Sequence, residues 1–263
     1  MTGWASRAAN RTVVGLVLLF LWTPIVVVFV VSFDTSTFLR FPPREFSFAP
    51  YVEVFQTAEF SRGLWISLVV AAGSTLLAIT VSTAAALALH RHRFRGSGIV
   101  QGFFVSPLLV PHIVLALALL LLFSPLGLTD GYTGLILAHL VLCIPYAIRT
   151  ISVSLSTADT ACEDAARVLG ANGWATFRRV TFPLIRPGVV AGAVMSFLVS
   201  FDEAVISLFL SGYYVKPLPV ALLEHVETQA GPEVAALSVL LILFSIAIML
   251  LLERMTGLRR SLR

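Results

Sequence analysis

The chain has 263 residues, of which 58% are hydrophobic and only 12% are charged. A soluble domain usually carries roughly 25% charged residues. This composition therefore excludes a globule that keeps its apolar surface out of water, and it predicts a multi-pass membrane protein.

Six uncharged apolar runs divide the chain, and each can supply one membrane crossing, which takes about 20 helical residues. The first run exceeds the roughly 7–15 apolar residues of a signal peptide, and no small-residue cleavage site follows it; it is expected to stay as the first helix. The longest run is too short for two crossings and a turn. The sequence thus predicts an all-α polytopic membrane protein with six transmembrane helices. The runs cover residues 12–33, 63–89, 96–129, 131–148, 187–215 (past two acids) and 234–252.

Arginines gather on alternate connections between these runs, whereas the other connections hold mainly acids. The positive-inside rule places the arginine-rich side, and so both termini, in the cytoplasm. Because the net charge of +4 at pH 7 reflects this topology, no nucleic-acid partner is expected. The arginines of this side are Arg7, Arg11, Arg91, Arg93, Arg95, Arg167, Arg178, Arg179, Arg254, Arg259, Arg260 and Arg263.

Prolines, histidines and small residues inside the runs shape the predicted helices. Pro111 predicts a bend, which serves either packing or gating. His112 and His139 lack the spacing of a metal site, and none is predicted. The small residues at 71–74 and 188–193 permit close helix contact, and the sequence leaves open whether the contact is within the chain or with another subunit.

A polar and amphipathic loop, residues 152–183, separates the fourth and fifth runs. Helix formers over 160–169 predict a helix that stops at Gly170. A second short helix is predicted over 172–180, ended by Pro183 and Pro187. The loop should therefore form a helix, a break and a second helix on the cytoplasmic face.

One side of the second helix is apolar. Trp174, Phe177 and Val180 recur at three-residue spacing, so they share a face, and Arg178 and Arg179 flank it. An aromatic anchor with a cationic rim suits insertion into a groove on another protein. The same pattern also fits a helix lying on the lipid surface, and spacing alone does not separate the two.

The loop resembles the EAA motif of permease subunits in binding-protein-dependent ABC importers. That motif reads Glu-Ala-Ala, three residues, Gly, nine residues, an aliphatic residue, any residue, Leu and Pro. Here Asp164 takes the Glu position, Gly170 the Gly position, and Phe182 and Pro183 the last two. With six runs and the loop between the fourth and fifth, the resemblance covers essentially the whole chain.

The resemblance implies a type I ABC importer permease fold, with residues 1–263 as a single transmembrane domain in a bacterial inner membrane. It implies these partners: two ATPase subunits, a second permease that is usually a paralogue, a periplasmic or lipid-anchored solute-binding protein, and membrane lipid. ATP and Mg would be used by the ATPases, so this chain is expected to bind no cofactor; it also has no Gly-rich phosphate loop with a lysine. The residues assigned to ATPase coupling are Asp164, Ala165, Ala166, Gly170, Asn172, Trp174, Phe177, Arg178 and Pro183.

Two adjacent acids, Asp202 and Glu203, interrupt the fifth run. Counted along a helix from Gly188, Asp202 lies roughly 20 Å into a core about 30 Å thick. Ionisable groups at depth usually face a cavity or a partner. Since neighbours on a helix point about 100° apart, one acid is expected to line a pathway beside Phe201 and the other to pair with a cation or backbone donor. A purely structural role for the acids stays open.

The stretch 200–212, followed by Leu218-Pro219-Val220, is similar to the spermidine/putrescine subfamily of these permeases. This resemblance implies a small cationic solute such as a polyamine. Relatives that handle opines, amino acid derivatives or aminophosphonates keep another small solute open. A secondary transporter is a more distant alternative, because no inverted repeat is evident. An intramembrane hydrolase is disfavoured, since the two acids are sequence neighbours.

Overall fold

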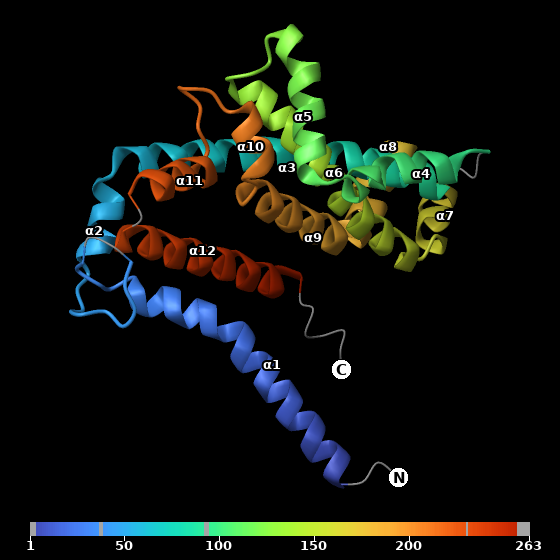
Figure 1. The fold of residues 1–263 in the computed structure, drawn as a ribbon. Helices are drawn as coiled ribbons and strands as arrows, with labels where there is room; N and C mark the ends of the chain where they lie inside the picture. Colours follow the sequence, from blue (N-terminus) through green and yellow to red (C-terminus); the bar gives the residue numbers. More distant parts are fainter. Residues whose placement is uncertain (1–3, 37–38, 92–94, 230, 257–263) are drawn as a thin grey trace. The chain divides into compact units, whose positions relative to one another are not determined.

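The computed structural model describes residues 4–36, 39–91, 95–229 and 231–256, and helices are the regular elements of these parts. Figure 1 follows them in chain order. The α-helices are α1 (Trp4–Val31), α2 (Ala49–Gln56), α3 (Ala58–Arg91), α4 (Ser97–Val105), α5 (His112–Phe123), α6 (Tyr132–Thr157), α7 (Ala161–Val168), α8 (Gly173–Thr176), α9 (Phe182–Phe201), α10 (Val205–Leu210), α11 (Leu218–Thr228) and α12 (Pro232–Thr256), with short 3₁₀ or π turns at Ser106–Leu109, Ser124–Leu126 and Phe177–Thr181.

The helices divide into two compact units, one of residues 1–61 with 222–244 and one of residues 62–221 with 245–263. Both contain long apolar helices. Within the described residues, five helical stretches are long and apolar enough to cross a membrane, or up to six if one bent pair is a single span. The all-α membrane fold is confirmed, whereas the single domain over residues 1–263 and the cytoplasmic placement of the termini stay predictions.

In the first unit, aromatic packing closes the connection after α1. The Phe33 ring lies 5.4 Å from that of Phe48 and 5.2 Å from that of Tyr51. The Tyr51 hydroxyl shares a 2.7 Å hydrogen bond with Ser32 Oγ. The aromatic residues of this connection therefore anchor α2 to the end of α1.

The second unit is built around α6 and α9, which lie along each other (Figure 1). Glycines allow the close approach: a Cβ on Gly188 would lie 2.8 Å from the Thr150 carbonyl oxygen, and one on Gly192 would lie 2.6 Å from Thr150 Oγ1. The small residues of α9 thus serve packing inside this chain at these two positions. Beside them, Ile148, Ile151 and other apolar side chains are buried.

Replacing Gly192 by valine is expected to lower the melting temperature of the purified chain in detergent. The added Cβ would also lie 3.2 Å from Ala147 Cα, so the two helices must separate, and overpacking of this kind costs about 1–3 kcal/mol. Gly102→Val is the matched control, because a Cβ at Gly102 meets nothing within 4 Å. Equal shifts for both variants would contradict the packing argument.

The third apolar run bends at Pro111, as predicted, but its two halves do not form the one helix expected of a single crossing. Its two halves, Ser97–Leu109 and His112–Leu126, meet at an angle of 107° (Figure 1). Pro111 has no N–H to continue the helix, and Val110 before it is extended, as residues preceding proline prefer. The segment is therefore a broken span or a re-entrant loop.

The fifth run also departs from the prediction of one helix carrying two acids in its middle. α9 ends at Phe201, and α10 starts only at Val205. The Glu203 carboxylate accepts hydrogen bonds from the amides of Val205 and Ile206, at 3.0 and 3.1 Å. Because the side chain takes the place of the backbone acceptors, the helix breaks at the acids.

Candidate functional site

The first helix of the 152–183 loop forms as predicted. Asp159 Oδ1 accepts a 2.9 Å hydrogen bond from the Ala161 amide at the start of α7. Gly170 ends the helix in the left-handed conformation, with φ +85°. The Gly170 amide bonds to the Arg167 carbonyl and the Ala171 amide to the Ala166 carbonyl, which is the Schellman ending that glycine favours.

The second helix begins as predicted but does not end at the prolines. Asn172 Oδ1 caps α8 by accepting a 2.8 Å bond from the Ala175 amide. A π turn over Phe177–Thr181 then leads directly into α9. Pro183 lies in the first turn of α9, where a missing N–H is tolerated, and Pro187 is accommodated within it. Gly173–Phe201 is consequently one helical rod from the loop into the membrane.

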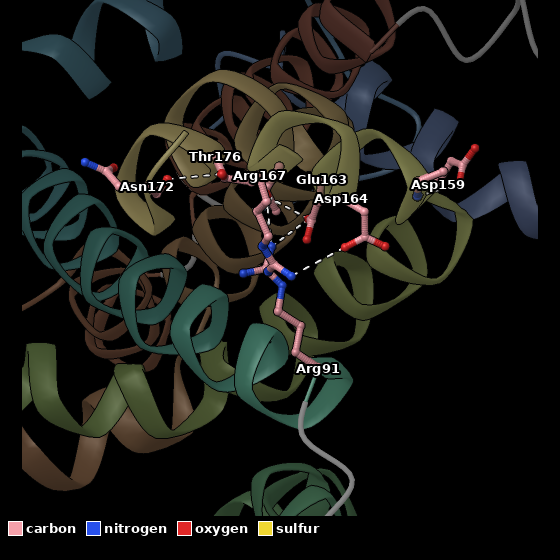
Figure 2. A network of polar contacts seen from close by, with 9 residues as sticks. Arg91, Asp159, Glu163, Asp164, Arg167, Asn172 and Thr176 are labelled. Atoms are coloured by element: carbon pink, nitrogen blue, oxygen red, sulfur yellow. Dashed lines mark hydrogen bonds and ion pairs between the residues drawn. The ribbon is translucent and has the colours of Figure 1, made fainter. Parts of the chain in front are cut away.

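Three side chains hold the loop to the end of α3. Arg91 Nη2 lies 2.6 Å from Glu163 Oε1 and donates a 2.8 Å bond to Thr181 Oγ1, which donates in turn to Glu163 Oε1 at 2.7 Å. Figure 2 shows Arg91 reaching from α3 toward Glu163. Glu163 and Thr181 are buried. We call this set the Arg91–Glu163–Thr181 brace. None of its three residues was predicted from the sequence to belong to the site.

Opposing effects set the pKa of Glu163 in the brace. Burial raises the pKa of Glu163, but the hydrogen bonds from Thr181 and Arg91, with the positive charge of Arg91, outweigh burial and leave that pKa below its ordinary value of 4.5. The brace therefore favours the ionised carboxylate. Asp164, in contrast, is exposed, and its carboxylate lies 3.5 Å from Arg167 Nη1. An exposed pair of this kind contributes little to stability.

Acidification is expected to remove the contribution of the brace to stability. Since the folded-state pKa of Glu163 is depressed, its contribution is fully present above pH 4.5 and is lost as the pH falls through the lowered pKa. The melting temperature of Glu163→Gln should therefore lie below that of the parent at neutral pH and converge with it in acid. Asp164→Asn is the control, with melting curves that should follow the parent throughout. A difference for Glu163→Gln that persists in acid would contradict this reading.

The residues assigned to ATPase coupling lie mostly on one exposed loop. All are exposed except Ala166 and Phe177, which are half-buried. Trp174 is 68% exposed, and its ring lies 5.6 Å from that of Phe177. Val168 and Leu169 are still more exposed, at 88% and 87%. Large apolar side chains that are exposed together on a braced loop indicate an interaction surface.

The two acids of the fifth run are placed differently. Glu203 is buried, and besides capping α10 its Oε2 lies 3.1 Å from His112 Nδ1 on α5. Asp202 is exposed. Phe201 is buried, with its ring stacked on that of Phe197 at 5.9 Å. Of the three residues proposed for the solute pathway, the structure therefore presents only Asp202 on the surface of the chain.

A buried polar network connects the two helices on either side of the α9–α10 break. His139 Nδ1 lies 2.8 Å from Ser200 Oγ, and its Nε2 lies 3.1 Å from Ser207 Oγ. Ser200 also bonds to Ser74 at 2.9 Å. His139 thus links α3, α6, α9 and α10, and in the described parts of the chain no group of three or more His, Cys, Asp or Glu is arranged to hold a metal.

The described residues combine several helices long and apolar enough to span a membrane with an exposed loop that is braced to α3, as in an integral membrane protein with an interaction surface. The family model described as "Binding-protein-dependent transport system inner membrane component" matches residues 78–258. The chain belongs to this family, the inner-membrane permeases of ABC importers. It is accordingly a multi-pass inner membrane protein.

Curated relatives match over most of the chain. It is 34% identical over 237 residues to the spermidine/putrescine transport system permease protein PotC of Haemophilus influenzae, covering 90% of this chain and 92% of that protein. It is 32% identical over 230 residues to the putrescine transport system permease protein PotI of Escherichia coli, covering 85% and 82%. The resemblance inferred from the loop motif and from residues 200–212 is confirmed.

Solved structures share the fold. A chain of a bacterial ABC transporter involved in the import of alginate superposes with a TM-score of 0.76 at 19% identity, covering 97% of this chain and 98% of that one. A chain of the MetNI methionine ABC transporter gives 0.64 at 18% identity, over 75% and 94%. The predicted ABC importer permease fold is therefore confirmed.

Proposed function

We propose that this chain forms half of the translocation pathway of an ATP-driven importer for a small polyamine-like cation, such as spermidine or putrescine. The named functions of PotC and PotI support this solute class. Asp202 supports it physically, because an exposed carboxylate beside a helix break in a membrane span attracts a cation. A different small solute, such as an opine, an amino acid derivative or an aminophosphonate, is the alternative.

The observation that carries the coupling role is the rigid path from loop to membrane. Trp174 is exposed on α8, and α8 continues through the π turn into α9, which ends at Phe201, the residue before Asp202. The Arg91–Glu163–Thr181 brace ties the same path to α3. Movement of a partner gripping Trp174 would therefore be carried as a rigid-body motion to the break at the acids.

The proposed mechanism is alternating access. Two ATPase subunits close on ATP and pull on the loops of this chain and of a second permease, a paralogue of this one. The pathway is thereby exposed to each side of the membrane in turn. A solute-binding protein delivers the cation from outside. ATP and Mg²⁺ belong to the ATPases in this scheme, and this chain supplies no catalytic group and binds no cofactor.

Reconstitution tests the proposal. The chain is assembled in nanodiscs with the ATPase, permease and binding protein encoded beside it, and ATP hydrolysis is measured across candidate solutes. Stimulation by binding protein loaded with spermidine or putrescine is the expected result. Stimulation by another solute alone would retain the importer and reject the polyamine, and failure to associate with any ATPase would reject the coupling role.

A further inference from the structure

A cavity of about 440 Å³ lies within the second unit, between α3, α4 and α6. Part of its wall is apolar, from residues such as Leu89, Val105 and Val153. Among the described residues, no carboxylate lines this cavity, and neither Asp202 nor Glu203 belongs to its lining. Its polar lining consists of His90, Gln101, Arg149, Ser152 and Ser156.

Arg149 is the dominant charge of this cavity. It belongs to α6, a helix long and apolar enough to span a membrane, about 12 Å before the helix end at Thr157. The described residues give Arg149 neither a hydrogen bond nor an ion pair within the chain. Arg149 is exposed at the wall of the cavity and follows directly on the apolar run 131–148. An anion from outside the chain could therefore reach its guanidinium and pair with it.

The donors around Arg149 specify what that anion should be. Guanidinium presents paired N–H groups that match two oxygens of a phosphate. The Gln101 amide and the Ser152 hydroxyl add neutral donors in the same cavity, whereas the Ser156 hydroxyl already donates to the Val153 carbonyl at 2.8 Å. A cavity of several hundred Å³ has the usual size of a small-molecule site.

We infer that this cavity binds a phosphate group, carried either by an anionic phospholipid headgroup or by a soluble phosphate. The surrounding surface fits the lipid source, since Ile99 and Phe103 on α4 are 79% and 73% exposed. Basic pockets between membrane helices are typical headgroup sites. In either case the phosphate neutralises Arg149.

The cavity adjoins the Arg91–Glu163–Thr181 brace along α3. His90 lines the cavity, and the next residue, Arg91, holds Glu163 and Thr181. A ligand in the cavity would therefore contact the last turn of α3, which also anchors the loop through Arg91. An effect of occupancy on ATP coupling rests on the proposed function, whereas phosphate binding itself does not.

Native mass spectrometry of the delipidated full chain tests the binding directly. The probes are dioleoylphosphatidylglycerol, with dioleoylphosphatidylcholine and inorganic phosphate for comparison. The parent is expected to retain phosphatidylglycerol in preference to phosphatidylcholine, and Arg149→Gln to weaken that binding about tenfold. Arg186→Gln is the matched control, because Arg186 is an exposed arginine on α9 that does not line the cavity; it should bind like the parent.

The outcomes separate the two sources. Retained lipid that millimolar phosphate does not displace assigns the headgroup, and competition by inorganic phosphate assigns the soluble ligand. Equal binding by the parent, Arg149→Gln and Arg186→Gln would overturn the inference. If Arg149→Gln does not fold, the double variant Gln101→Leu with Ser152→Ala replaces it, and unchanged lipid affinity there would equally overturn it. No ATPase is needed, so this failure is distinct from failure of the proposed importer.

Discussion

Trp174→Asp is expected to abolish uptake while leaving the chain inserted and folded. Trp174 is 68% exposed and neighbours mainly Phe177, so its loss removes little packing within the chain. At a protein interface, truncating an anchoring tryptophan costs about 2 kcal/mol or more, and a carboxylate in an apolar groove adds a desolvation penalty. Co-purification of the ATPase should fall at least about thirtyfold by this cost.

Two companion variants sharpen this result. Trp174→Phe keeps an apolar ring and should retain most of the ATPase association. Gly170→Pro should uncouple hydrolysis from uptake, because Gly170 has φ +85° whereas proline requires about −65°; the α7 ending would be lost. Normal uptake by well-expressed Trp174→Asp or Gly170→Pro would contradict the assignment of this loop as the coupling element.

The parts of the loop that could be predicted are those with local signals. Gly170 stops α7 because its own backbone adopts the left-handed region, and Asn172 caps α8 through a donor three residues away. Such contacts join residues that are close in the sequence, so a local pattern can predict them. The end of the second helix at Pro183 was predicted wrongly, because the π turn before it lets the helix continue.

The errors elsewhere come from contacts between distant segments. Nothing in the spacing of the sequence relates Arg91 to Glu163, which are 72 residues apart, so Arg91 could be read only as a marker of orientation. Likewise, Glu203 could be placed near the middle of a run, but its pairing with His112 depends on α5 turning through 107° at Pro111. Periodicity and composition predict elements and membrane spans, and the tertiary arrangement decides which polar groups meet.

Asp202→Asn and Glu203→Ala are both expected to reduce uptake, the first by weakening cation binding and the second by destabilising the chain. Glu203 caps α10 and faces His112, so its removal leaves the Val205 and Ile206 amides without an acceptor and should lower the melting temperature and the amount of chain in the membrane. Loss of a cap alone costs about 1 kcal/mol. Asp202 is exposed and should be dispensable for folding, but its charge would be needed to attract a cation.

Paired measurements of abundance and of labelled putrescine uptake distinguish the two acids. Asp202→Asn should keep parental abundance and lose at least about tenfold in uptake, since a charged contact is worth roughly 1.5–3 kcal/mol. Glu203→Gln is the control for Glu203→Ala: it preserves an acceptor for the α10 amides and should restore much of the lost abundance. If Asp202→Asn depletes the chain as Glu203→Ala does, both acids are structural. The cation would then have to be recognised by groups on the second permease, and a neutral solute would fit this half of the pathway equally well.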